Sequence, residues 1–300
     1  MNRKHLNRRN FLAASLALTG LALSPPARKM DRLAFSTLGC PDWSLDQIVR
    51  CAGDNGYSGL EFRGLLGEMD MTRVPDFMPS RLPETRRKLH DEGLKIVNLG
   101  SSAKMHFAES DTRQANLDEG KRYIDLAQEL DCPFIRVFPD DLPANQPVEK
   151  TLDLISSGLR YLASYASGTG VTVLLESHGK VVYRDMLLKI MQDADHPGTG
   201  LIWDYFNMWI VTKEAPSAVF ATLQAYIRHI HLKDASLTTG KPAYCLLGEG
   251  VGPLAEVMSA LKAGGYEGYL SFEWEKRWHP EILGPEIAFP HFARAIRKYR

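Results

Sequence analysis

Short apolar or β-branched runs recur along the chain from residue 33 onward, and longer segments with apolar positions at helical spacing lie between them. Eight of these runs have the length of a strand: residues 33–38, 57–62, 94–99, 134–138, 171–176, 200–204, 227–232 and 268–273. The helical segments cover residues 45–54, 83–92, 116–130, 148–167, 182–193, 215–225, 254–263 and 285–299. This alternation is typical of consecutive βα units that build a parallel sheet.

Glycines mark several of the predicted helix ends. Gly56, Gly93, Gly170 and Gly265 each stand between a helical segment and the next strand, where a left-handed residue ends a helix at low cost. The run after the first strand, Gly-Cys-Pro-Asp-Trp at 39–43, has no glycine-rich phosphate-binding pattern of the doubly wound nucleotide-binding folds. The sequence therefore predicts an α/β fold with a single (β/α)8 TIM barrel over residues 31–300.

The composition supports a globular enzyme-sized domain. Of 300 residues, 44% are hydrophobic and 24% are charged, which suffices for a sizeable core. Lys plus Arg and Asp plus Glu number 36 each, so the formal charge is zero and no strong positive field favours nucleic acid as a partner. We therefore expect a small-molecule partner. The oligomeric state stays open, and a homo-oligomer is compatible with the sequence.

The N-terminal segment has the layout of an export signal. Residues 7–12 read Asn-Arg-Arg-Asn-Phe-Leu, and the apolar stretch at 11–23 is too short to span a bilayer core of about 30 Å. We interpret residues 1–27 as a twin-arginine signal peptide, which predicts export to the periplasm and no stable membrane span. The alternative is a frayed amphipathic N-terminus.

Four cysteines are scattered along the chain, at Cys40, Cys51, Cys132 and Cys245. They form no Cys-x-x-Cys pair, which argues against a zinc knuckle or a thioredoxin-like site. We expect free thiols rather than a disulfide.

Four consecutive strands from the fifth to the eighth end in side chains that can bind a metal. These are Glu176, Asp204, His231 and Glu273. The C-terminal strand ends of a parallel barrel converge on one mouth, so all four can face the same point. Taken singly, each could be a helix cap, an ion-pair partner or a core histidine, but together they predict one metal site. Its oxygen-rich donors suit Mn²⁺ or Mg²⁺, with Zn²⁺ or Co²⁺ as alternatives.

Several motifs carry a resemblance to a known family. They are Gly-Tyr-Ser-Gly-Leu-Glu at 56–61, Leu-Glu-Ser-His at 175–178, Asp-Tyr-Phe-Asn at 204–207, His-Ile-His-Leu-Lys-Asp at 229–234, Leu-Gly-Glu-Gly at 247–250 and Phe-Glu at 272–273. The chain resembles the sugar phosphate isomerase/epimerase family with a xylose isomerase-like barrel. That resemblance implies the same four metal ligands, and it implies that Glu176 and Glu273 exchange the proton on opposite faces of an enediolate.

Further polar residues near the predicted metal site are candidates for substrate binding. His178, Asn207, Lys233 and Glu61 are the predicted substrate-binding residues, and His229 is expected to lie deeper, behind His231. Asn207 and Leu237 stand where ketose epimerases of the family carry a histidine and an arginine, which weakens a specific epimerase assignment.

Structural interpretations of two of these residues stay open. Lys233 could pair with Asp234 at the rim, and Glu61 could pair with Arg63 or Arg136.

The predicted function is a metal-dependent isomerase or epimerase that removes a proton next to the carbonyl of an unphosphorylated sugar or keto-sugar. The main alternative is a metal-dependent lyase of the inosose or dehydroshikimate dehydratase type on the same site. An apurinic endonuclease on a related barrel would need three zinc ions and a basic groove, and the neutral charge argues against it. A sugar-binding module without turnover is the remaining alternative.

Overall fold

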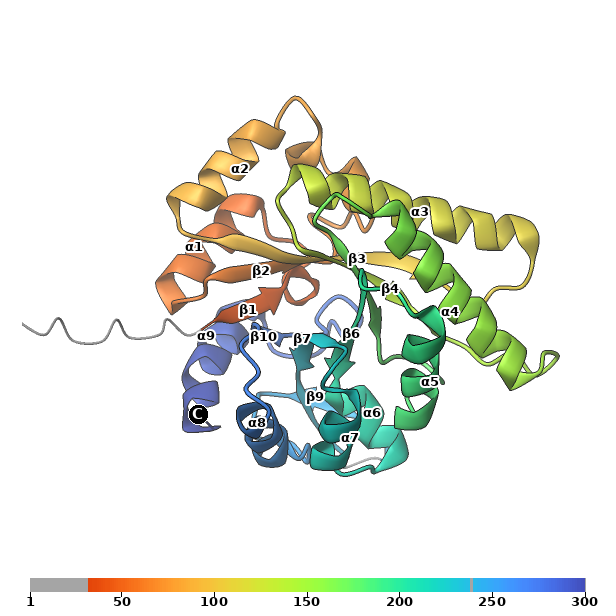
Figure 1. Cartoon of the computed structure of the whole chain (residues 1–300). Helices are drawn as coiled ribbons and strands as arrows, with labels where there is room; N and C mark the ends of the chain where they lie inside the picture. The colour runs from red at the N-terminus through yellow and green to blue at the C-terminus, as the bar shows by residue number, and fades with distance from the viewer. Residues whose placement is uncertain (1–31, 238–239, 300) are drawn as a thin grey trace, which may run out of the picture. The chain divides into compact units, whose positions relative to one another are not determined.

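Eight parallel strands form a closed barrel, which confirms the predicted TIM fold (Figure 1). The computed structural model describes residues 32–237 and 240–299, so the signal predicted for residues 1–27 lies outside the described residues. Around the barrel the order is β1, β10, β7, β6, β5, β4, β3, β2. The barrel strands are β1 Leu33–Ser36, β2 Gly59–Phe62, β3 Lys95–Lys104, β4 Phe134–Phe138, β5 Thr172–Glu176, β6 Thr199–Asp204, β7 Ile227–Leu232 and β10 Leu270–Phe272.

Helices surround the strands on the outside of the barrel (Figure 1). They are α1 Leu45–Asn55, α2 Leu82–Asp91, α3 Ser110–Glu129, α4 Val148–Tyr165, α5 Arg184–Ala194, α6 Tyr205–Thr212, α7 Pro216–Leu223, α8 Leu254–Ala263 and α9 Pro285–Ala295. All eight predicted helices are present. The helix predicted from residue 116 begins earlier, at Ser110, because the Glu109 carboxylate caps it by accepting from the backbone N–H groups of Asp111 and Thr112.

Helix α6 was not predicted from the sequence. It begins directly after β6, where the Asp204 carboxylate accepts a hydrogen bond from the backbone N–H of Asn207 at 2.9 Å. Asp204 is therefore both the last residue of a strand and the cap of a helix. One carboxylate oxygen makes the cap, and the other points toward the strand ends.

The predicted helix ends are confirmed. Ser44 and Gln47 form a reciprocal capping box at the start of α1. Gly56 ends the same helix at φ 74°, and the other three predicted glycines also have positive φ. These residues place the carboxyl end of each helix next to the start of the following strand.

A short antiparallel hairpin follows β7, formed by β8 Asp234–Ser236 and β9 Ala243–Cys245. The Asp234 carboxylate accepts four backbone N–H groups, from Ala235, Gly248, Gly250 and Gly252, at 2.9–3.0 Å. A Cβ on Gly250 would lie 2.1 Å from Asp234 Oδ1, so this glycine lets the loop close on the carboxylate. Asp234 thus fixes the Leu-Gly-Glu-Gly segment against the end of β7.

The apolar core lies between the strands and the helices. Phe35 stacks on Phe289, and Phe272 stacks on both Trp274 and Phe292. The interior of the barrel is polar by contrast, with Glu61, Asn98, His229 and Ser271 buried there. All four cysteines are free thiols, as predicted.

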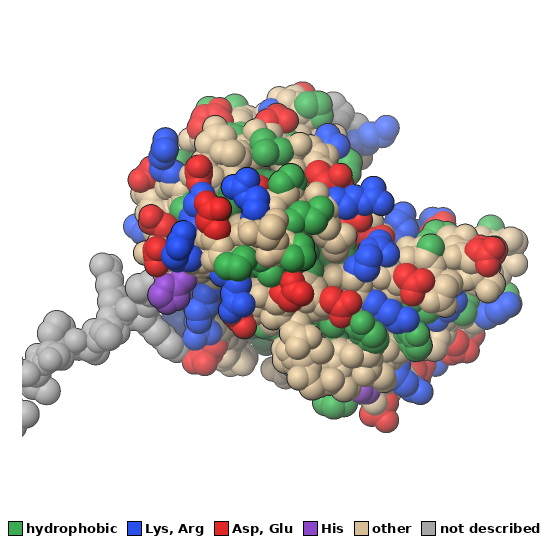
Figure 2. Space-filling view, turned by 90° about the horizontal axis from the view of Figure 1, so that it is seen from above, with side chains coloured by type: hydrophobic (Ala, Val, Ile, Leu, Met, Phe, Trp, Pro, Cys, Tyr) green, Lys and Arg blue, Asp and Glu red, His purple; other side chains and the backbone are tan. Residues whose placement is uncertain are grey.

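On the face above α2 and α3, acidic and basic side chains are interspersed (Figure 2). The balanced charge of the sequence is therefore reproduced locally on this face. Among the described residues, no helix combines the length and the apolar character needed to cross a membrane.

Candidate metal and active site

The four predicted ligands converge at one end of the barrel. Glu176 ends β5, Asp204 ends β6, His231 lies near the end of β7, and Glu273 follows β10 directly. One ligand atom from each lies within 4.8 Å of the others, and all four side chains are buried. The strand register explains the convergence. Asp204 pairs with His231, whereas Glu176 pairs with Ile202 and His231 with Ser271, each two residues before the next ligand, so all four side chains point to the same side of their strands.

Each glutamate of this cluster is held by one cation. Arg136 Nη1 on β4 donates to Glu176 Oε2, and Lys233 Nζ donates to Glu273 Oε2 at 2.7 Å. The remaining oxygen of each glutamate faces His231 Nδ1, at 3.6 Å from Glu176 and 3.3 Å from Glu273. Each glutamate thus presents one oxygen to the centre of the cluster and anchors the other.

These cations shape the ionisation of the carboxylates. Burial raises the pKa of Glu176, but Arg136 and His231 together outweigh burial and the neighbouring Glu273, and the pKa falls to about 2. Burial raises the pKa of Asp204 to about 7; Lys233 opposes this rise, and the neighbouring carboxylates of Glu273 and Glu176 add to it. The three buried carboxylates repel one another at such short range, and Arg136 and Lys233 offset part of this repulsion.

His231 is oriented from below by a second buried group. Its Nε2 lies 3.1 Å from both oxygens of Glu61, and His229 Nε2 lies 2.8 Å from Glu61 Oε2. Burial raises the pKa of Glu61, but the two histidines outweigh it and hold the pKa well below its usual value. The ionised Glu61 therefore takes the Nε2 proton of His231 as a hydrogen bond and leaves Nδ1 to face the cluster.

The predicted substrate contact at Glu61 meets a different environment. Glu61 is 1% exposed, and Ser271 Oγ donates to it as well. The pairing with Arg63 or Arg136 considered above does not form. This geometry favours a positioning role for Glu61 beneath the cluster over a contact with substrate.

Lys233 is likewise enclosed by the cluster. Its Nζ lies 2.7 Å from Asp204 Oδ2, Glu273 Oε2 and Glu275 Oε1, and the residue is 1% exposed. The predicted pair with Asp234 is wrong, because the Asp234 carboxylate accepts hydrogen bonds from the backbone of the Leu-Gly-Glu-Gly segment instead. Lys233 therefore neutralises carboxylates around the cluster.

His178 and Asn207 lie nearer the surface, where a substrate could reach them. His178 Nδ1 is 3.1 Å from Asp140 Oδ1, its ring packs on Phe138, and 38% of its side chain is exposed. Burial lowers the pKa of His178, but Asp140 and Glu176 together outweigh burial, and the pKa lies above its usual value. Asn207 is half-buried in the first turn of α6.

Two side chains that hold the cluster were not predicted in that role. Arg136, considered from the sequence only as a partner of Glu61, stands in the middle of the apolar run Phe-Ile-Arg-Val-Phe, and a charge at such a position indicates a buried partner. Its partner Glu176 is 40 residues away, which local patterning does not reveal. Glu275 was missed because it follows the strand by three residues and contacts only Lys233 in the cluster.

The buried donors fit a divalent cation. Three carboxylates and one imidazole nitrogen converge, and His231 Nδ1 has no hydrogen-bond partner among the described residues. Burial lowers the pKa of His231, but the surrounding carboxylates outweigh it and raise the pKa well above its usual value, so this site attracts a positive charge. A divalent cation between Nδ1 and the carboxylate oxygens would take the place of the Nδ1 proton. Glu176, Asp204, His231 and Glu273 are the residues that would hold it.

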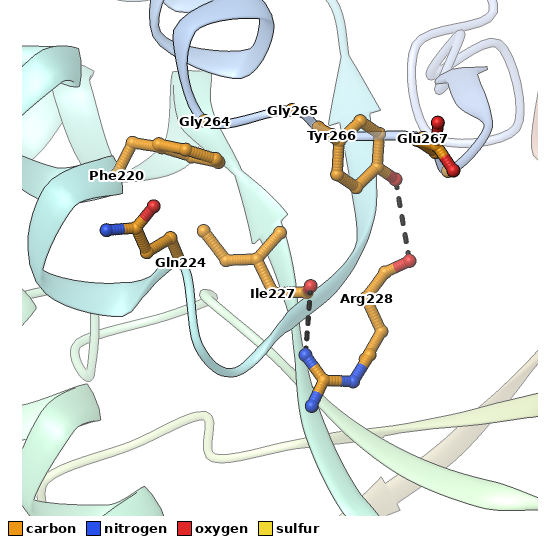
Figure 3. A pocket seen from close by; sticks show the side chains of 9 residues that line it. Phe220, Gln224, Ile227, Arg228, Gly264, Gly265, Tyr266 and Glu267 are labelled. Carbon is orange, nitrogen blue, oxygen red and sulfur yellow. Dashed lines mark hydrogen bonds between the residues drawn. The ribbon is translucent and has the colours of Figure 1, made fainter.

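A pocket of about 290 Å³ lies at the opposite end of β7, beside Phe220, Gln224, Arg228 and Tyr266 (Figure 3). Arg228 donates to the carbonyl of Ile227, and the Tyr266 hydroxyl donates to the carbonyl of Arg228. These side chains satisfy the backbone at the amino ends of the strands, a region that serves stability in TIM barrels. The chemistry-bearing cluster is at the other end.

Residues 49–297 match the sequence profile of the xylose isomerase-like TIM barrel family, and the chain belongs to this family. It is 26% identical over 201 residues to a 3-dehydroshikimate dehydratase of Pseudomonas putida, matching 63% of this chain and 31% of the dehydratase. It is 22% identical over 247 residues to a fructoselysine 3-epimerase of Shigella flexneri, with 79% and 87% of the two chains covered.

A solved structure of a probable 3-dehydroshikimate dehydratase from Bacillus anthracis has the same fold. It superimposes with a TM-score of 0.73 at 17% identity, over 89% of this chain and 98% of the dehydratase. The relatives of this chain therefore include both epimerases and dehydratases.

Proposed function

We propose that this protein is a metal-dependent sugar isomerase or epimerase that removes a proton from the carbon next to a carbonyl. The observation that carries the proposal is the pair Glu176 and Glu273, which enter the cluster from β5 and β10 with β6 and β7 between them. Each presents one oxygen to the centre of the cluster, and its other oxygen is anchored by a cation. Two such carboxylates can remove a proton on one side of a carbon and return it on the other.

The chain's own residues define the roles in this chemistry. Glu176, kept ionised by Arg136, takes the proton from carbon and passes it to solvent, and Glu273, held by Lys233, takes a proton from solvent and returns it to the opposite face. Glu176, Asp204, His231 and Glu273 would hold a divalent cation, which would supply Lewis-acid chemistry to the substrate carbonyl. Asp204 and His231 fix the remaining positions of the site, and Mn²⁺ or Mg²⁺ suits their donor set better than Zn²⁺ or Co²⁺.

The direct test is exchange of carbon-bound hydrogen with deuterated solvent, screened over keto-sugars and aldoses after metal analysis of the purified protein. Glu176→Gln and Glu273→Gln should each reduce exchange by at least a hundredfold, because the amide cannot take the proton. Glu129→Gln, at the exposed end of α3, serves as the control and should keep full exchange. Retained exchange in either active-site variant would overturn the assigned proton carriers.

A lyase on the same site is the second candidate, favoured by the similarity to the Pseudomonas putida dehydratase. The same proton removal followed by loss of a β-hydroxyl gives a product lighter by one water. Mass analysis of the product separates the two reactions, because epimerisation leaves the mass unchanged.

Export by a twin-arginine signal is part of the proposal as well, on the basis of the Arg-Arg pair at positions 8 and 9. A reporter that is active only in the periplasm is fused after residue 27. Replacing both arginines with lysine should block export of this fusion, so that it stays in the cytoplasm. Unchanged export of that fusion would remove this part of the proposal.

A further inference from the structure

Two buried arginines meet beside the cluster. Arg63 directly follows β2, Arg136 lies on β4, and Gly100 on β3 lies between them. A Cβ built on Gly100 would lie 2.7 Å from Arg63 Cδ and 2.8 Å from Arg136 Nη2. The absence of a side chain at Gly100 therefore makes room for both arginine side chains at one place.

The hydrogen-bonding capacity of these arginines is only partly used. Arg63 Nη2 donates to Ser102 Oγ at 3.0 Å, and Arg136 Nη1 donates to Glu176. Among the residues that the structure describes, Arg63 Nη1, Arg136 Nε and Arg136 Nη2 have no acceptor. The two residues are only 8% and 3% exposed. Buried guanidinium N–H groups without acceptors are costly, and two adjacent cations add their repulsion.

The charge of Arg63 is compensated less directly than that of Arg136, which pairs with Glu176. Burial and the neighbouring Arg136 guanidinium lower the pKa of Arg63 to about 10, although Tyr123, Glu119 and Glu176 act in the opposite direction. Ser102, which accepts its hydrogen bond, is an exposed residue, so this guanidinium lies just below the surface of the barrel mouth. Arg136 is packed against the ring of Phe138 at 3.8 Å, which leaves the edges of its guanidinium for acceptors.

We infer that Arg63 and Arg136 form a subsite for an oxyanion group of the substrate, a carboxylate or a phosphate ester. The inference rests on the proposed function, because it places this group beside Glu176, the assigned proton acceptor. Paired guanidinium donors match the oxygens of such groups in a bidentate arrangement. The substrate class is then an acidic sugar or keto acid rather than a neutral ketose.

The first test measures anion binding without turnover. Acetate and inorganic phosphate are titrated into the metal-loaded full-length protein, with acetamide as the neutral analogue of acetate. We expect saturable binding of an anion, weakened at least tenfold by Arg63→Gln, with no binding of acetamide. Arg63→Lys keeps the positive charge but lacks the paired N–H donors of the guanidinium, so its affinity for the anion should lie between those of the native protein and Arg63→Gln. Preference for acetate or for phosphate identifies the group.

Arg228→Gln is the control, because Arg228 lies at the opposite end of the barrel in the pocket of Figure 3. It should leave anion binding unchanged. Circular dichroism and thermal melting of the Arg63 variants check that the fold is intact. Equal affinities in the native protein and in folded Arg63→Gln would overturn the subsite, because the anion would then be bound elsewhere or the donors would be satisfied by water.

A second test separates this inference from the proposed function. In the exchange screen, Arg63→Gln should raise KM for acidic substrates at least tenfold with a smaller change in kcat. Exchange confined to neutral keto-sugars and unaffected by Arg63→Gln would remove the subsite and leave the proton-transfer function standing. Anion binding lost in Arg63→Gln, together with no exchange on any substrate, would keep the subsite and remove the proposed reaction.

Discussion

Single residues at the strand ends act in pairs, with one side chain facing the cluster and another orienting it. Arg136 orients Glu176, Lys233 orients Glu273, and Glu61 orients His231. Each interaction leaves one donor atom directed to the same point. A metal site of this kind depends on the orienting groups nearly as much as on its ligands.

Glu61→Gln tests this dependence. The amide cannot hold the Nε2 proton of His231 as the carboxylate does, so we expect the affinity for Mn²⁺ to fall by roughly 10- to 100-fold. Titration against a competing chelator measures this affinity. Glu68→Gln, on an exposed turn after β2, should bind Mn²⁺ as the native protein does. An unchanged affinity in Glu61→Gln would show that His231 needs no orientation from below.

Among the secondary-structure elements, the alternation of strand and helix could be predicted from the sequence because strands and helices differ in the spacing of their apolar residues. The eight barrel strands and the four predicted strand-end residues follow from that pattern. Helix α6 and the β8–β9 hairpin do not, because each depends on a single carboxylate: Asp204 caps α6, and Asp234 holds a loop more than ten residues away. The contact between Arg136 and Glu176 could not be predicted either, because it joins two separate strands.

Asp234→Asn is the corresponding test of element stability. An amide offers one acceptor oxygen where the carboxylate serves four N–H groups, so about 2–4 kcal/mol of unfolding free energy should be lost. Urea denaturation measures the loss. Asp195→Asn, at an exposed left-handed helix end, provides a matched change that should stay within about 0.5 kcal/mol. A similar small effect in Asp234→Asn would mean that the loop is held by other contacts.

The whole molecule should respond to metal because the four converging side chains come from separate strands and are brought together only in the folded state. At a metal concentration of 100 times Kd, ligand linkage adds about 2.7 kcal/mol to stability. A domain of this size should then melt roughly 5–10 °C higher with Mn²⁺ than with EDTA. Differential scanning calorimetry measures this shift. Identical melting temperatures, with Mn²⁺ present in excess, would contradict a metal bound to the folded state.

We expect one divalent cation to bind among Glu176, Asp204, His231 and Glu273. The most direct measurement is the anomalous difference density of a crystal grown with Mn²⁺. One strong peak should lie within coordination distance of all four side chains. A fully occupied Mn²⁺ bound elsewhere, or no peak between these side chains, would contradict this expectation.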